Sequence, residues 1–181
     1  MVVAMLSREY IAGLFDGEGS VTIGCTKKSR TNWAFVPHAS LANNYKPILE
    51  LLQKEFGGYI GPVGGKSRCW ALNFTTKAAK DFLLVILPFL VIKKKQAEIL
   101  VDFIETRQQY QEQPSFRRTT RPGARIYPES YFWFALTCRW YIRKLNGTFS
   151  EEKYKQEYAG LTQNFSEFDC SEELLEEFIS F

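Results

Sequence analysis

Hydrophobic residues recur along the first 110 positions with two spacings, one typical of helices and one typical of strands. Apolar residues three or four positions apart predict a first helix from Arg8 to about Gly17, with Ser7 as its N-cap. The same spacing predicts three further helices, at 45–58, 76–90 and 93–110. Gly57 is expected to close the second helix, and Pro88 to end the third.

Two segments, 20–28 and 33–43, alternate with the period of two that is typical of half-buried strands. Their apolar positions share one face: Val21, Ile23, Cys25, Phe35, Ala39 and Leu41. Their small and polar positions share the other face: Thr22, Gly24, Thr26, His38 and Ser40. Pro37 predicts an edge position or a bulge in the second strand. A glycine-turned hairpin is predicted over 58–74, with these residues facing inward: Trp70, Leu72 and Phe74.

The order helix, two strands, helix, two strands, helix, helix predicts an α+β fold. Consecutive hairpins pair into an antiparallel sheet, and the helices gather on one of its faces. The other face is left bare, and its outward residues are polar or basic: Thr22, Thr26, Lys28, His38, Ser40 and Arg68.

The last third of the chain differs in composition from the rest. The segment 114–125 carries four arginines and no acidic residue, so we expect an exposed basic arm. The aromatic stretch 127–147 predicts a buried helix, and the acidic remainder, 150–181, predicts one or two helices that cap the domain. We therefore expect a core at 1–113 and a helical extension of the same domain at 114–181. No internal repeat is found, and the opening helix has no second copy.

The net charge of +3 conceals two long segments that contain no acidic residue. No Asp or Glu lies between Gly19 and Leu49, or between Phe56 and Lys80. Both segments contain Lys and Arg residues, and the first contains the single histidine of the chain, His38. Because a solvated surface normally mixes charges of both signs, this distribution predicts a polyanionic partner such as nucleic acid.

Composition disfavours several other classes of protein. The four cysteines are too scattered for a zinc site, and we expect them to be reduced: Cys25, Cys69, Cys138 and Cys170. The longest apolar run, 82–92, is too short to cross a bilayer and is interrupted by a proline. No signal peptide is evident, so we expect an intracellular, non-secreted protein without a membrane partner.

The segment 10–21, "YIAGLFDGEGSV", is unusual for a helix. Each glycine in a helix interior costs roughly 1 kcal/mol relative to alanine, and Asp16 and Glu18 place negative charge at the negative end of the helix dipole. A core helix with a glycine cap would leave both glycine–acid pairs unexplained. Residues 11–20, "IAGLFDGEGS", resemble the signature of the LAGLIDADG homing endonucleases, and 87–100, "LPFLVIKKKQAEIL", resembles the segment in which the family's lysine-bearing loop enters the last core helix.

The resemblance covers about residues 8–110 and implies an αββαββα fold, to which this chain adds C-terminal helices. In this family a four-stranded antiparallel sheet forms a DNA-binding saddle that lies in the major groove. Chains with one signature act as homodimers, so the resemblance implies a homodimer that hydrolyses both strands of a long pseudo-palindromic DNA site. Small side chains would let two signature helices meet at a dimer interface, which we expect at Ala12, Gly13, Asp16 and Gly17, with Asp16 also supporting the turn.

The resemblance assigns metal contact to the Glu18 carboxylate and to the backbone carbonyl of Gly17. It implies Mg²⁺ or Mn²⁺, which prefer hard oxygen ligands, and no other small-molecule cofactor. Such a cation would stabilise charge on the phosphate oxygens and lower the pKa of an attacking water. Ca²⁺ is expected to bind without supporting cleavage.

Two further catalytic positions follow from the resemblance. The family's lysine after the "PFL" turn matches Lys93, which would polarise water or neutralise developing charge, with Lys94 and Lys95 as open alternatives. Many members carry a glutamine at the end of the second strand, and Asn43 is the nearest polar residue here, with a shorter side chain.

DNA contacts are expected on the outward strand face, in the second hairpin and in the basic arm. These residues are Thr22, Gly24, Thr26, Lys28, Arg30, His38, Ser40, Lys66, Ser67, Arg68, Arg117 and Arg118, with Arg121 and Arg125 adding phosphate contacts. An exposed polar strand face remains the alternative for this set, and His38 is either a DNA contact or merely exposed. A splicing maturase or a cleavage-inactive DNA-binding protein of the same fold is the alternative function, and the acidic Glu18 favours the enzyme.

Overall fold

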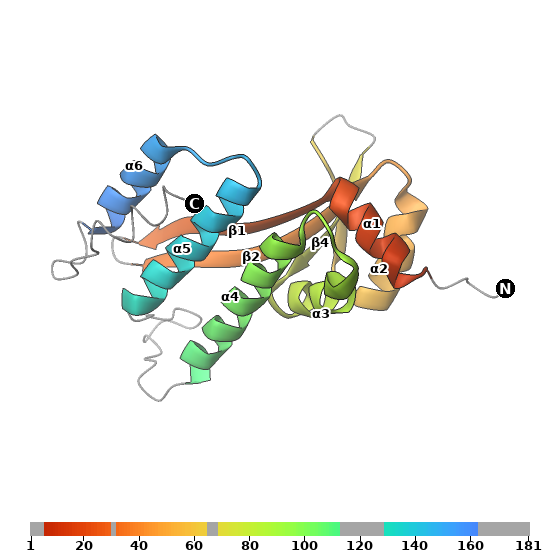
Figure 1. The fold of residues 1–181 in the computed structure, drawn as a ribbon, viewed down its shortest axis with the longest axis horizontal. Coiled ribbons are helices and arrows are strands. Elements are labelled where there is room, and N and C mark those ends of the chain that lie inside the picture. The colour runs from red at the N-terminus through yellow and green to blue at the C-terminus, as the bar shows by residue number, and fades with distance from the viewer. Residues whose placement is uncertain (1–5, 30–31, 65–68, 113–128, 163–181) are drawn as a thin grey trace.

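The computed structural model describes residues 6–29, 32–64, 69–112 and 129–162 (Figure 1). The elements occur in the predicted α+β order, α–β–β–α–β–β–α, and then continue with further helices. They are α1 (Arg8–Glu18), β1 (Gly19–Ser29), β2 (Asn32–Asn43), α2 (Lys46–Phe56), β3 (Tyr59–Pro62), β4 (Trp70–Thr75), α3 (Thr76–Ile86), the 3-10 turn η1 (Leu87–Phe89), α4 (Lys94–Glu112), α5 (Glu129–Leu145) and α6 (Glu151–Thr162).

The predicted helix boundaries are confirmed where a specific residue sets them. The Ser7 hydroxyl accepts a hydrogen bond from the Tyr10 amide at 3.2 Å and so caps α1. Gly57 ends α2 with a φ of 75°, in the left-handed region that favours glycine. Pro88 lies in η1, directly after the end of α3.

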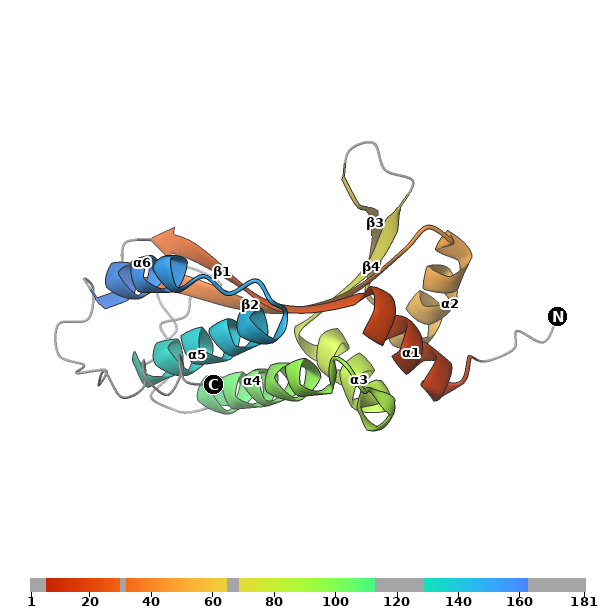
Figure 2. The ribbon, with the colours of Figure 1, turned by 45° about the horizontal axis from the view of Figure 1, so that its top comes forward.

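All strands pair antiparallel in one sheet, in the order β1-β2-β4-β3. The predicted apolar face of the strands turns toward the helices, and Val21, Ile23, Phe35 and Leu41 are all buried there. Figure 2 shows the strands curving, so that the face turned away from α3 and α4 is concave. The sheet therefore has one face covered by helices and one open, saddle-like face.

Pro37 occupies a position where its missing N–H costs nothing. It lies opposite Ile23 of β1, whereas the pairing of β2 with β4 begins one residue later, at His38. β2 is thus a central strand along its second half, but at Pro37 it has a strand partner on one side only. The predicted edge position is correct for this part of the strand, and the register shift within the pairing lies elsewhere, between Lys27 and Ser29.

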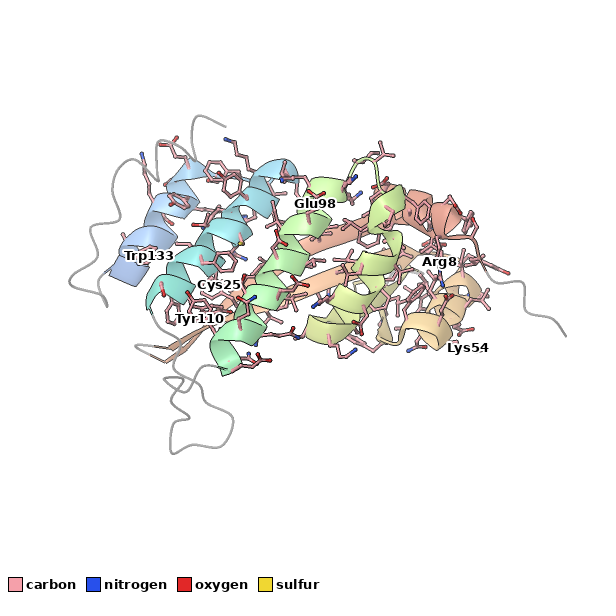
Figure 3. The ribbon with its side chains drawn as sticks, turned by 60° about the horizontal axis from the view of Figure 1, so that its bottom comes forward. Arg8, Cys25, Lys54, Glu98, Tyr110 and Trp133 are labelled. Atoms are coloured by element: carbon pink, nitrogen blue, oxygen red, sulfur yellow. The ribbon has the colours of Figure 1, made fainter. Side chains whose placement is uncertain are left out.

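The core under the sheet is built around aromatic side chains. The Phe82 ring of α3 stacks on Phe74 of β4 at 4.4 Å between ring centroids and meets Phe15 of α1 edge-on at 5.4 Å. At the other end, Trp140 of α5 meets Tyr154 of α6 at 5.2 Å. Figure 3 shows α3, α4, α5 and α6 lying side by side in this order. The helices after α3 therefore lengthen the same layer.

Side chains from this helical layer satisfy carbonyl groups on open stretches of strand. Asn146 donates to the Val21 carbonyl of β1 at 3.0 Å, and Arg139 donates to the Ile23 carbonyl. Arg107 donates to the Phe35 carbonyl of β2 at 3.3 Å, in the stretch that β4 does not reach. Because unpaired strand carbonyls invite pairing with another chain, these contacts protect the sheet edges.

Candidate active site and nucleic-acid interface

Asp16, near the C-terminal end of α1, holds the loop between η1 and α4. Its Oδ2 accepts a hydrogen bond from the Val91 amide at 2.8 Å, and its Oδ1 accepts one from the Lys93 amide, also at 2.8 Å. The side chain is buried, with the residue 9% exposed. The predicted support of the turn by Asp16 therefore takes the form of a two-point clamp on a loop far away in the sequence.

The surroundings of this carboxylate explain how a negative charge is tolerated at the negative end of a helix. Burial raises the pKa of Asp16, but the amides of Val91, Lys93 and Ile92 and the charge of Lys93 outweigh burial and hold the pKa below its ordinary value of 3.8. α1 has no basic residue in its own last turn, so the loop supplies the compensating charge.

Lys93 turns back onto the end of α1. Its Nζ donates a hydrogen bond to the backbone carbonyl of Asp16, the residue before Gly17. Lys94 and Lys95 are exposed, and Lys95 forms an ion pair with Glu98 of α4 at 3.6 Å. Of the three candidate lysines, Lys93 is the one whose ammonium the structure brings to the predicted metal-binding end of α1.

The outward side of α1 is open. Gly13 and Gly17 are exposed, and a Cβ added at either position would meet no atom within 4 Å. Glu18 is exposed at the same end of the helix. Gly13 and Gly17 are thus not required by packing within this chain, and the space beside them is available to a partner.

Two residues predicted for a dimer interface lie inside the chain instead. Ala12 is fully buried in the core, and Asp16 is buried under the loop that it clamps. The spacing of a helix explains this correction, because positions 11, 12, 15 and 16 form the inward side of α1 while 13 and 17 lie on the outward side. An interface prediction for α1 therefore rests on its glycines.

Asn43 ends β2, opposite Trp70 of β4, and its side chain is engaged locally. Its Oδ1 accepts a hydrogen bond from the Tyr45 amide at 2.8 Å, which shapes the turn into α2. The pairing of Gly19 with Leu41 puts the end of β2 beside the start of β1, so Asn43 lies at the same end of the sheet as Glu18. The structure gives Asn43 a turn-forming contact, and its catalytic role stays a prediction.

The open face of the sheet carries rows of residues that cross several strands. Thr22, His38 and Thr75 form one row, and a second row runs through Ser20, Ser40, Asn73 and Tyr59. Gly24 lies opposite Val36, and Thr26 opposite Ala34. The predicted outward residues of the first two strands thus do share one face, and no acidic residue lies on the part of it that the structure describes.

The side chains of the other predicted DNA contacts lie outside the described part of the structure. Lys28 belongs to β1, but its side chain lies outside the described part of the structure. The remaining predicted contacts also lie outside the described residues: Arg30, Lys66, Ser67, Arg68, Arg117, Arg118, Arg121 and Arg125.

Some residues at these surfaces were missed by reasoning from sequence. Asn73 and Tyr59 complete the second row but were not among the predicted DNA contacts. The period-two pattern of the second hairpin does place Asn73 on the outward side of its strand. Val91 and Ile92 are 83% and 70% exposed, in the loop that Asp16 clamps. Nothing in the apolar run 82–92 distinguishes these two from its buried members, because only the loop conformation turns them outward.

The described residues show three further features. No group of three His, Cys, Asp or Glu side chains within them is arranged to hold a metal ion. Among the helices that they form, none combines the length and the hydropathy that crossing a membrane requires. Cys25, Cys69 and Cys138 are not in disulfide bonds, and Cys170 lies outside the described residues.

Solved homing endonucleases share this fold at low sequence identity. I-CvuI in complex with its target in the presence of Ca is 15% identical, with a TM-score of 0.63 over 85% of this chain and 93% of that chain. The archaeal intron-encoded I-Vdi141I complexed with DNA is 14% identical, with a TM-score of 0.67 over 86% and 94%. I-SmaMI bound to an uncleaved DNA target in the presence of calcium ions is 19% identical, with a TM-score of 0.60; the match covers 97% of this chain but 58% of that one.

Sequence comparison gives a family but no individual relative. No curated protein sequence matches the chain. A family model described as LAGLIDADG endonuclease matches residues 11–108, which contain the signature helix, the whole sheet and most of α4. Because this match covers more than half of the chain, the protein belongs to the LAGLIDADG endonuclease family.

Proposed function

We propose that the chain is one subunit of a homodimeric, metal-dependent endonuclease that cuts both strands of a long, nearly palindromic DNA site. The observation that carries this proposal is the position of the Lys93 ammonium on the backbone of α1, beside Gly17 and the exposed Glu18. Metal-assisted phosphodiester hydrolysis requires oxygen ligands for the metal and a positive charge near the phosphate. The end of α1 provides a carboxylate, a helix-end carbonyl and a lysine, next to an open, acid-free sheet face.

The open side of α1 supports the dimer. Two helices can bring their backbones close together only where side chains are small, and Gly13 and Gly17 provide such positions on successive turns. Tyr10, one turn before Gly13, is 51% exposed, and Val91 and Ile92 add apolar surface at the other end of the helix. A second copy of the chain would cover this surface, whereas a monomer would leave it in water.

The donor atoms present fit one half of a magnesium site. The exposed Glu18 carboxylate and the Gly17 carbonyl are hard oxygen ligands, but the described residues of one chain do not supply a complete ligand set. In the proposed dimer the second Glu18 and the DNA phosphates supply the remainder. When bound, the cation would contribute Lewis-acid stabilisation of charge on the phosphate.

The chain's own groups would then complete the reaction. The Lys93 ammonium can neutralise charge that develops on the phosphate oxygens, and Asp16 fixes the backbone of Lys93 in place. The open sheet face would lie in the major groove, as the likeness to homing endonucleases solved with DNA supports. We keep 1–113 as the core and 114–181 as an extension of the same domain, because Arg139 of α5 donates a hydrogen bond to the Ile23 carbonyl of β1.

A cleavage assay on a selected site tests the proposal. The purified chain is incubated with a randomised DNA library in Mg²⁺ or Mn²⁺, and cut molecules are recovered; we expect one enriched, nearly palindromic sequence. Replacing Mg²⁺ by Ca²⁺ should leave binding and remove cutting. DNA binding without cutting in either Mg²⁺ or Mn²⁺ would identify a binding protein, and binding to RNA alone would identify a maturase.

A further inference from the structure

Val36 of β2 places an apolar side chain on the open face of the sheet. Phe35 and Pro37, which flank it in the strand, are buried, whereas Val36 points the other way and is 41% exposed. Among the described side chains of β1 and β2, no other large apolar residue is exposed. Val36 is therefore an exception on a part of the face that otherwise carries small and polar residues.

The surroundings of Val36 leave its side chain uncovered. Directly opposite on β1 lies Gly24, which is itself exposed and has no side chain. A Cβ added at Gly24 would meet only the Val36 carbonyl oxygen, at 3.7 Å, so packing within the chain does not require a glycine there. Two positions away along β2 lie Ala34, which is small, and His38, which is half-buried. The pair Gly24–Val36 thus presents one isolated apolar group that a partner can reach.

Side chains of the helical layer hold the backbone around Val36 in place. Arg107 of α4 donates a hydrogen bond to the carbonyl of Phe35 at 3.3 Å. On the neighbouring strand, Arg139 of α5 donates one to the carbonyl of Ile23. This stretch of the hairpin lies beyond the part of β2 that pairs with β4. Because both of its strands are nevertheless bonded to helices, Val36 is presented in a defined position.

We propose that Val36 is a specificity-determining residue that packs against the 5-methyl group of a thymine in the major groove. Thymine presents this methyl group there, whereas the other groups by which the four bases are distinguished are hydrogen-bond donors and acceptors. A valine pressed against a donor or an acceptor would remove it from water without a hydrogen bond, which is unfavourable. This inference rests on the proposed DNA binding and names the base that one part of the surface reads.

Replacing thymine by uracil tests the inference, because the two bases differ only in the 5-methyl group. In the DNA site recovered by selection, each thymidine is replaced in turn by deoxyuridine, and binding is measured by gel shift in Ca²⁺. The uracil factor is the ratio of the dissociation constants with and without this replacement. We expect one thymine in each half-site to give a uracil factor of about three to five in the wild type, as for one methyl group returned to water.

Variants of Val36 and of a second exposed valine make the comparison specific. Val36→Ser removes both methyl groups of the side chain, so the uracil factor at that thymine should fall to about one. Val85→Ser makes the same change at an exposed position of α3, outside the sheet, and should keep the wild-type factor. The thermal unfolding midpoint reports on the fold of each variant. If Val36→Ser does not fold, Val36→Thr keeps the β-branched shape that strands favour and should at least halve the factor.

Site selection gives a second readout. Sequences recovered with the wild type should favour thymine at this position of each half-site, and sequences recovered with Val36→Ser should not. Equal preferences in the two proteins would overturn the inference.

The two proposals fail in different ways. A chain that binds no DNA overturns the proposed function, and this inference with it. A chain that binds and selects DNA, but whose uracil factors are the same in wild type and Val36→Ser, overturns this inference alone, because the valine then serves only the strand that contains it.

Discussion

Asp16 and Lys93 are bonded to each other twice, although 77 residues separate them in the sequence. The Asp16 carboxylate accepts from the Lys93 amide at 2.8 Å, and the Lys93 ammonium donates to the Asp16 backbone carbonyl. The carboxylate thereby fixes the lysine's backbone, and the lysine places its charge against the end of α1. Asp16 of the signature helix thus positions Lys93, which is a proposed catalytic residue.

Replacing Asp16 by Asn should destabilise the fold. An amide can accept from one of the two loop amides but must point an N–H group at the other, so we expect a loss of about 1–3 kcal/mol in the free energy of unfolding. Urea unfolding followed by circular dichroism measures this loss. Asp81→Asn, at an exposed carboxylate paired with Lys77 on α3, is the matched control and should change stability by less than about 1 kcal/mol. Equal losses in both variants would contradict the clamp.

The same carboxylate should make stability depend on pH in the acid range. Because the pKa of Asp16 is lower in the folded protein than its ordinary value of 3.8, the unfolded chain binds this proton more readily. The stabilising contribution is therefore complete above the ordinary pKa and is lost as the pH falls through the folded pKa. Urea unfolding from pH 7 to pH 3 measures the difference in the free energy of unfolding between wild type and Asp16→Asn. This difference should stay constant down to about pH 4 and become smaller below it.

Glu18→Gln should abolish cleavage and leave DNA binding nearly intact. The substitution keeps the shape of an exposed side chain and removes the charge that would hold a divalent cation. Cleavage should therefore be lost, whereas the DNA-binding face of the sheet is unchanged. Cleavage and gel-shift assays on the selected site separate the two effects, with Asp102→Asn on α4 as the charge-matched control at an exposed position. Undiminished cleavage by Glu18→Gln would show that the metal lies elsewhere.

Lys93→Met should lower the cleavage rate by about 10²- to 10³-fold, as expected when one group that stabilises developing charge is removed. Lys94→Met and Lys95→Met are the comparison variants, because both lysines are exposed rather than turned toward α1. Single-turnover cleavage at saturating protein isolates the chemical step from binding. A larger loss in Lys94→Met or Lys95→Met than in Lys93→Met would transfer the role to that lysine.

Gly13→Leu should convert the dimer to a folded monomer. A Cβ added at Gly13 meets nothing within 4 Å outside its own helix backbone, so folding is expected to survive, whereas a second α1 could no longer approach closely. Sedimentation velocity gives the oligomeric state, and the thermal unfolding midpoint reports on the fold. Asp102→Leu introduces the same side chain at an exposed position of α4 and should remain a dimer. A dimer of unchanged stability in Gly13→Leu would place the interface away from α1.

Much of the fold follows from local pattern. The periods of 2 and 3.6 residues predicted every helix and strand of the core, because each element must bury one side, and they also predicted which residues of β1 and β2 face away from the helices. The signature at 11–20, the segment 87–100 and the predicted order of elements together indicated the family, which the family model confirms.

Contacts between distant segments were decided only by the tertiary structure. Sequence left three lysines as candidates, and the path of the loop after η1 turned Lys93 alone toward α1. Ala12 looked like an interface residue by size, but the rotation of α1 on the core buried it. Local sequence thus determined which elements form and which side of each is apolar, whereas the packing of those elements determined which polar groups meet, because hydrogen bonds between segments depend on relative positions that are set only when the whole core closes.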